Sequence, residues 1–160
     1  MKEVYTFSYQ VADIENITQE QQNLLQSARQ ARKNAYAPYS NFHVGAAVLL
    51  SNGEVVLGNN QENAAYPSGI CAERAAIFAA MANQPSASII RLAIAAGKKG
   101  DPFPISPCGS CRQVLVEYEN RQKKQFEILF EFGDDKVIIV DAAADLLPFA
   151  FRADMLNARD

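Results

Sequence analysis

Cys71-Ala72-Glu73-Arg74 and Pro107-Cys108-Gly109-Ser110-Cys111 are the two stretches around which the rest of this sequence is organised. Together they contain all three cysteines of the 160-residue chain. Each stretch lies where a helix is expected to begin, and the C-x-x-C spacing puts two sulfurs about one helical turn apart, so both can face one point. The pattern predicts three thiolates and one glutamate at the meeting point of two helix starts.

Outside these stretches, helical and strand patterns follow one another. A helix is expected to begin at Thr18, with Gln21 completing a capping box, and to end before Pro38. Asn52-Gly53 between two apolar runs predicts a hairpin. The other expected elements are a helix over 71–83, a strand over 88–96, a loop over 97–106, a helix to about residue 122 that Ser106 caps and Pro107 begins, and strands over 126–132 and 137–140.

This order of elements predicts the fold class. Alternation of strands and helices favours an α/β protein, a three-layer α/β/α sandwich with a mixed sheet of about five strands. Residues 18–160 are expected to form a single domain. Residues 1–17 are expected to be an N-terminal extension, in which Tyr5, Phe7, Tyr9 and Val11 alternate with polar residues and predict a half-buried extra strand or a subunit contact.

Composition excludes several classes of protein. The formal net charge is −3, and the densest basic run, 121–124, is expected at a helix C-terminus, where cations are favoured. No basic face for nucleic acid is therefore expected. No apolar run reaches the length of about 18 residues that a membrane span needs, and no signal peptide is recognisable. An odd number of cysteines fits a reducing compartment, so a cytoplasmic protein is expected.

The three cysteines predict a catalytic zinc site. Unpaired N–H groups at helix starts stabilise thiolates, and the thiolate is the form that binds metal. Structural zinc sites close with four protein ligands, whereas catalytic sites have three and leave a position for water. Cys71, Cys108 and Cys111 are the expected ligands. For His43, the single histidine, a surface or interface position is favoured over a role as fourth ligand.

Two neighbouring residues would add chemistry to this site. Glu73 is two positions after Cys71 on the first helical turn, so its carboxylate can take a proton from water and pass it to a leaving nitrogen. The alternative is a glutamate placed there by the helix dipole alone. Arg74 could draw negative charge from the thiolates, or it could form a surface salt bridge instead.

Taken together, the motifs resemble those of the cytidine deaminases of the small, homotetrameric, three-cysteine type. The resemblance covers residues 20–155 and lies in the stretches 39–47 (YSNFHVGAA), 60–66 (NQENAAY), 71–74 (CAER), 107–113 (PCGSCRQ) and 146–151 (LLPFAF). It implies one zinc ion per chain on the three cysteines, Glu73 as the proton shuttle and Arg74 as the residue that neutralises the thiolates.

The same resemblance implies a substrate site. Asn60 and Glu62 match residues that hydrogen-bond the ribose, in a loop that continues through Asn63 to Tyr66. Polar residues that merely stabilise this loop are the alternative, and Gln61 stands where an apolar residue is expected. The remaining matches are the pocket aromatic Phe42, the backbone N–H of Ala72 facing the base carbonyl, and Phe151 stacking on the base in a neighbouring subunit. Phe151 could instead be packed in the core.

The expected activity is hydrolytic deamination of cytidine and 2′-deoxycytidine to uridine and 2′-deoxyuridine, with release of ammonia. The expected partners are a small nucleoside and three further copies of the chain, with neither nucleic acid nor membrane. One alternative is a deaminase of another small aminopyrimidine nucleoside, such as a nucleoside antibiotic. The other is a structural zinc module without enzymatic activity, which would leave Cys71 and Glu73 without a purpose.

Overall fold

A computed structural model of the chain describes residues 1–97 and 103–157. The strands are β1 (Gln10–Asp13), β2 (Gly45–Leu50), β3 (Val55–Asn59), β4 (Ile89–Ala95), β5 (Glu127–Phe132) and β6 (Lys136–Val140). The helices are α1 (Gln19–Arg32), α2 (Ala72–Asn83), α3 (Gly109–Gln122) and the short α4 (Asp154–Asn157), with 3-10 turns η1 (Ile14–Asn16), η2 (Tyr66–Ser68) and η3 (Ala143–Leu146). The loop expected over 97–106 and the domain end at residue 160 fall partly outside the described residues.

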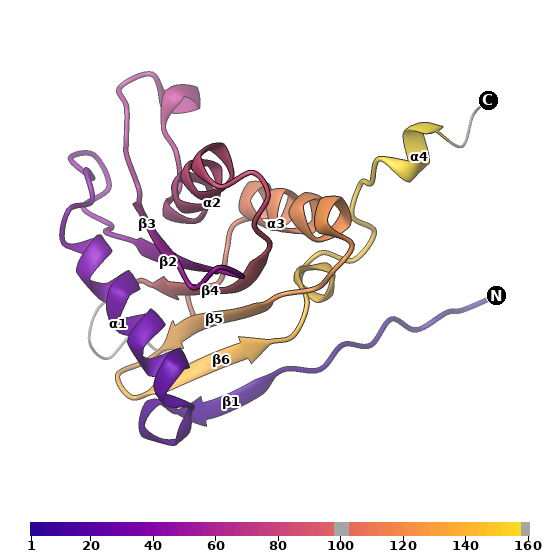
Figure 1. Cartoon of the computed structure of the whole chain (residues 1–160), viewed down its shortest axis with the longest axis horizontal. Helices are drawn as coiled ribbons and strands as arrows, with labels where there is room; N and C mark the ends of the chain where they lie inside the picture. The colour runs from indigo at the N-terminus through magenta and orange to yellow at the C-terminus, as the bar shows by residue number, and fades with distance from the viewer. Residues whose placement is uncertain (98–102, 158–160) are drawn as a thin grey trace.

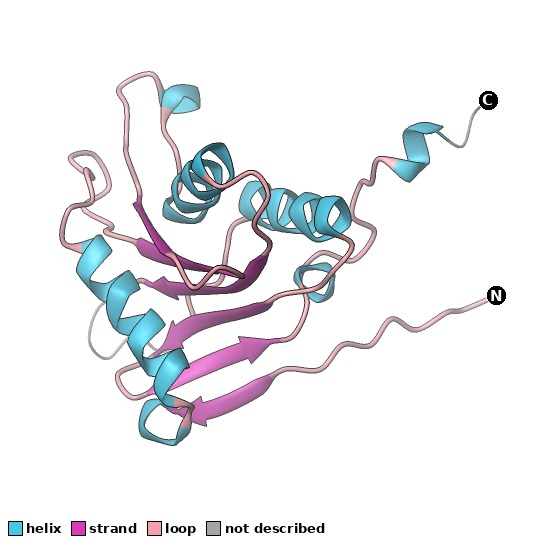
Figure 2. Ribbon diagram, in the orientation of Figure 1, coloured by secondary structure: helices cyan, strands magenta, loops and turns pink. Residues whose placement is uncertain are grey.

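The described strands form one mixed sheet with helices on both faces, which confirms the three-layer sandwich (Figures 1 and 2). The strand order is β1-β6-β5-β4-β2-β3, with β4 and β5 parallel and the other neighbours antiparallel. One apolar cluster packs α1 against the sheet, and a larger one packs α2 and α3 against the opposite face. Among the described residues, no helix has both the length and the apolar character needed to cross a bilayer.

The sheet has six strands in the described part of the chain rather than about five, because the N-terminal segment adds β1 at its edge. This strand begins later than the alternating pattern predicts. Of the alternating residues, Val11 lies in β1, whereas Tyr5, Phe7 and Tyr9 precede it, so the extra strand is present but does not extend over these three residues. The segment before β1 extends past the end of the sheet (Figure 1), and the Tyr5 hydroxyl donates a hydrogen bond to the Ala144 carbonyl at 3.3 Å.

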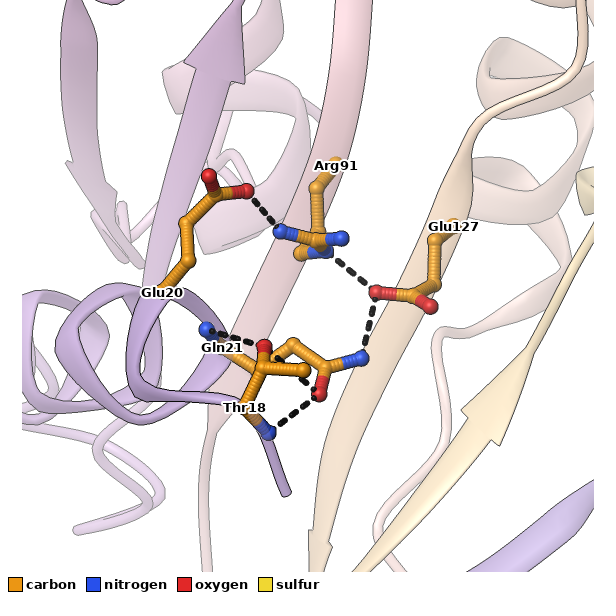
Figure 3. Close-up of polar contacts among 5 residues, drawn as sticks. All are labelled: Thr18, Glu20, Gln21, Arg91 and Glu127. Carbon is orange, nitrogen blue, oxygen red and sulfur yellow. Dashed lines mark hydrogen bonds and ion pairs between the residues drawn. The ribbon is translucent and has the colours of Figure 1, made fainter.

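The start of α1 confirms the predicted capping box. Thr18 Oγ1 accepts a hydrogen bond from the Gln21 amide at 3.3 Å, and Gln21 Oε1 accepts one from the Thr18 amide at 2.9 Å. Gln21 Nε2 also donates to Glu127 Oε1 at 2.9 Å. Arg91 forms ion pairs with both Glu20 and Glu127, so one polar network joins the start of α1 to β4 and β5 (Figure 3).

The helix α3 begins differently from the prediction. Its N-cap residue is Cys108, and its first helical residue is Gly109. The prediction that Ser106 caps this helix and Pro107 begins it is therefore wrong. The Ser106 hydroxyl instead accepts a hydrogen bond from Arg112 Nη2 at 2.7 Å, so the guanidinium takes the place that a helix amide was expected to fill.

Two glycines of the β2–β3 hairpin let helices lie close to opposite faces of the sheet. A Cβ atom at Gly58 would lie 2.4 Å from the Ala76 amide nitrogen of α2. One at Gly45 would lie 2.0 Å from the Ala28 carbonyl oxygen of α1. Because these distances are far below van der Waals contact, neither helix could pack so closely against any other residue type.

Candidate active site

The three cysteines come together at two helix starts. Cys71 is the N-cap residue of α2, Cys108 is the N-cap residue of α3, and Cys111 lies in the first turn of α3. The Sγ atoms of Cys71 and Cys108 are 3.8 Å apart, and those of Cys108 and Cys111 are 3.6 Å apart. Sulfur atoms bound tetrahedrally to one zinc ion at about 2.3 Å lie about 3.8 Å from one another. The donor set therefore fits zinc.

Strand direction explains why the two helix starts meet. The strand β3 is antiparallel to β2, and β2 is antiparallel to β4, so β3 and β4 run in the same direction. The helix α2 follows β3 in the chain, and α3 follows β4 as the crossover to the parallel strand β5. Both helices consequently begin at the same edge of the sheet, beyond the carboxyl ends of parallel strands, where α/β proteins commonly bind ligands.

Charge at the cluster is balanced by thiol and guanidinium donors. The pKa of Cys71 is lowered to about 5, because the Cys111 thiol donates to its sulfur and Arg74 donates as well. The same hydrogen bond and burial raise the pKa of Cys111. Arg74 Nη2 lies 3.5 Å from Cys71 Sγ, whereas its buried Nε has no partner among the described residues. The guanidinium thus faces sulfur, as the charge-neutralising interpretation requires.

Glu73 is a buried carboxylate beside this cluster. It lies in the first turn of α2 with only 5% of its surface exposed, and it lines a cavity together with Cys71 and Cys108. Burial raises the pKa of Glu73, and the nearby negative charge of Cys71 adds to this effect. A carboxyl group with a raised pKa can both accept and donate a proton near neutrality, which is what an acid–base catalyst needs.

The cavity next to the thiols has a volume of about 550 Å³, within the range of small-molecule sites. All the predicted substrate residues except Phe151 are among the described residues that line it: Phe42, Asn60, Glu62, Asn63, Tyr66 and Ala72. The lining also includes residues without a predicted role, among them Tyr39, Ser40, Val44, Ile70, Ile105 and Ser106. Tyr39 packs edge-on against Tyr66, with ring centroids 6.3 Å apart. Tyr39 and Ser40 belong to the 39–47 motif, so the resemblance already pointed to them.

The proposed sugar-binding residues also hold the loop 39–44. Asn60 Oδ1 accepts from the Val44 amide at 2.8 Å, and Asn60 Nδ2 donates to the Phe42 carbonyl at 2.9 Å. Glu62 accepts from the Ser40 hydroxyl and from the Tyr39 amide, the latter at 2.8 Å. These bonds, that from the Ser40 hydroxyl above all, lower the pKa of Glu62. Asn60 and Glu62 therefore do stabilise this loop, and the ionised Glu62 carboxylate lies on the cavity wall as a hydrogen-bond acceptor.

Phe151 and His43 lie apart from the cluster. Phe151 is 57% exposed, and its carbonyl oxygen accepts from Gln113 Nε2 at 2.7 Å. It is not among the described residues that line the cavity of its own chain, and it is not packed in the core. His43 is exposed, and the metal-binding group formed by the described residues consists of the three cysteines without it.

Comparison with known proteins places this site in a family. The sequence model of the cytidine and deoxycytidylate deaminase zinc-binding region matches residues 18–125. A cytidine deaminase of Halalkalibacterium halodurans is 41% identical over 138 residues, which cover 86% of this chain and 98% of that protein. One from Sporosarcina psychrophila is 40% identical over 136 residues, covering 85% and 94% respectively.

Solved structures agree with the sequences. The crystal structure of cytidine deaminase from Burkholderia pseudomallei superimposes with a TM-score of 0.69 at 40% identity, covering 84% of this chain and 100% of that chain. That of the Mycobacterium tuberculosis enzyme gives a TM-score of 0.62 at 36% identity, covering 81% and 94%. The thiol cluster, the buried glutamate and these matches lead to one conclusion: the chain belongs to the cytidine and deoxycytidylate deaminase family of zinc enzymes.

Proposed function

We propose that this chain catalyses the hydrolytic deamination of cytidine and 2′-deoxycytidine, producing uridine or 2′-deoxyuridine and ammonia. The observation that carries the proposal is the cluster of three thiols, spaced for one tetrahedral zinc ion, with buried Glu73 beside it on the wall of a nucleoside-sized cavity. A structural zinc module would require neither the cavity nor a buried carboxylate, whose burial is costly without a function.

Cys71, Cys108 and Cys111 would hold the metal. Zinc, when bound, supplies Lewis-acid activation of water. Glu73 takes a proton from the attacking water while the water oxygen adds to C4 of the base. It then gives that proton to the ring nitrogen N3. In the second half of the reaction Glu73 carries the remaining proton to the exocyclic amine, the C4–N bond breaks, and ammonia leaves. The one carboxyl group thus returns to its starting state at the end of each turnover.

The cavity wall supports nucleoside binding. The Ala72 amide lies at the start of α2, where backbone N–H groups have no acceptor within the helix, so it can donate to the base carbonyl. Glu62 can accept hydrogen bonds from ribose hydroxyls, and the amide of Asn60 can both donate and accept. Phe42 and Tyr66 supply aromatic surface for the base and sugar. Asn63 holds the turn that leads into Tyr66, because its Oδ1 accepts from the Ala65 amide at 2.9 Å.

The assembly and the cellular location are further parts of this proposal. A homotetramer in which Phe151 enters the cavity of a neighbouring subunit is supported by the 57% exposure of Phe151 and by the full exposure of Phe149 beside it. A reducing compartment, the cytoplasm, is supported by the three free thiols that the metal needs. The division into an extension over 1–17 and one deaminase domain from residue 18 stays a prediction.

Two variants and a substrate panel test the proposed function. Glu73→Gln should keep stoichiometric zinc but lose most turnover of cytidine, measured by ultraviolet absorbance, and near-normal turnover would contradict the proton-shuttle role. Cys108→Ala should lose both zinc and activity, and retained stoichiometric zinc would contradict the ligand set. A panel of aminopyrimidine nucleosides identifies the substrate, because preferential turnover of a compound other than cytidine or 2′-deoxycytidine would replace the proposed reaction.

A further inference from the structure

The guanidinium of Arg112 makes three hydrogen bonds to the chain around the metal site. Its Nε donates to the Pro107 carbonyl at 2.7 Å, its Nη2 to the Ser106 hydroxyl at 2.7 Å, and its Nη1 to the Leu146 carbonyl at 2.9 Å. Two of these acceptors immediately precede Cys108 in the chain. The third belongs to η3, so one side chain joins the loop before α3 to the C-terminal part of the molecule.

This loop lies between two cavities. Ser106 lines the cavity that holds Glu73, and it also lines a second cavity of about 310 Å³. The wall of the second cavity includes Arg112 and Leu146 together with apolar residues from β5 and β6. Ser106 therefore borders both cavities, and the Arg112 guanidinium that it accepts from lies on the wall of the second one.

Cys108 depends on this support more than the other two thiols do. Cys111 is fully buried within α3, and Cys71 is partly buried and receives a hydrogen bond from Arg74. Cys108 is exposed and lies at the junction between the loop and the helix. Because a small displacement of the loop would move its sulfur directly, the three-ligand geometry depends on the position of Pro107.

We propose that Arg112 is a positioning residue of the metal site, which holds Cys108 in register with Cys71 and Cys111 by clamping Ser106 and Pro107 to η3. The inference rests on the proposed zinc site but not on the identity of the nucleoside. A planar guanidinium can reach three acceptors in fixed directions, whereas a lysine ammonium on its flexible stem cannot reproduce that fork. Residues that orient metal ligands from outside the ligand set commonly change metal affinity or activity by about 10- to 100-fold.

The test compares zinc retention in four variants of the zinc-loaded full chain. Arg112→Gln and Arg112→Lys should release zinc to a chromogenic chelator about 10- to 100-fold faster than the wild type. Ser106→Ala, which removes a single acceptor, should give a smaller acceleration. The matched control is Arg121→Gln on the same helix, whose guanidinium stacks on Tyr118 at 4.7 Å and which should release zinc at the wild-type rate.

Folding is checked by circular dichroism, and kcat and KM for cytidine are measured in parallel. Folded Arg112 variants that release zinc within twofold of the wild-type rate would overturn the proposal, and so would full rescue by lysine. If the Arg112 variants do not fold, Ser106→Ala decides, because an unchanged release rate in that variant overturns the clamp. A wild type that retains zinc but turns over no cytidine would refute the proposed function while leaving the clamp supported by the retention data.

Discussion

Substitution of Gly58 by alanine should disturb the active site from outside it. The added Cβ would lie 2.4 Å from the Ala76 amide nitrogen and 2.6 Å from the Ala72 carbonyl oxygen, both backbone atoms of α2. Ordinary contact begins at 3.4 Å, so α2 must move away from β3 by about 1 Å. No side-chain rotation can relieve the clash, because the backbone fixes the position of Cβ and the α2 atoms that it meets belong to the main chain.

A displaced α2 should affect both stability and catalysis. Overpacking of this kind costs about 1–3 kcal/mol in the free energy of unfolding. The same helix carries Cys71 at its N-cap and Glu73 in its first turn. A misplacement of about 1 Å at a reacting group can lower the rate about 100-fold. We therefore expect Gly58→Ala to lower kcat/KM for cytidine by one to two orders of magnitude in the folded protein.

Two other glycines provide matched controls. Gly45→Ala creates a similar clash with α1, which carries no candidate ligand, so it should lower the melting temperature but leave the zinc content stoichiometric. Gly109→Ala adds a Cβ beside Cys108 with nothing within 4 Å, so it should change stability by no more than about 1 kcal/mol. The assays are thermal unfolding, zinc content and cytidine kinetics. Wild-type stability and kcat/KM in Gly58→Ala would refute the reasoning.

Three further predictions concern stability. In the metal-free protein the folded-state pKa of Glu73 is raised above its usual value of 4.5, so folding binds a proton and stability falls as pH rises from 4.5 through the raised pKa. Glu73→Gln should therefore be more stable than the wild type at pH 8 and lose this advantage below about pH 4.5, and urea unfolding that shows the opposite slope would contradict it. Glu119→Ala should lower the free energy of unfolding by at least about 2 kcal/mol, because the buried carboxylate accepts from the amides of Phe126, Ala143 and Ala144 and its loss leaves these donors unpaired. A decrease of less than about 1 kcal/mol in urea unfolding would contradict this prediction. Thr18→Ala should cost about 1 kcal/mol by removing the N-cap of α1, with Thr18→Ser as the control that retains it.

Local patterns were sufficient to predict most elements of the fold. The capping box at Thr18, the Asn52-Gly53 hairpin and the apolar runs that became β4, β5 and β6 each depend on residues close in sequence. Local patterns did not predict the start of α3 correctly. Ser106-Pro107 has the local chemistry of a helix start, but the Ser106 hydroxyl accepts from Arg112, and the helix begins at Gly109 with Cys108 as its N-cap. The N-terminal strand likewise begins later than the alternating pattern predicts. Its position is set by pairing with β6, a segment far away in the sequence.

The candidate site shows the same division. The residue types and their spacings, three cysteines and one glutamate at two helix starts, determined which chemistry the chain could perform, and the family motifs pointed to the residues of the cavity. Only the tertiary structure decided that Cys71 and Cys108 meet, that Asn60 and Glu62 hold the loop 39–44, and that Arg112 donates to Pro107 and Leu146. Side-chain spacing along a helix is a local property of the backbone. Which helix starts share an edge depends on strand directions, and these are set by pairings between segments far apart in the chain.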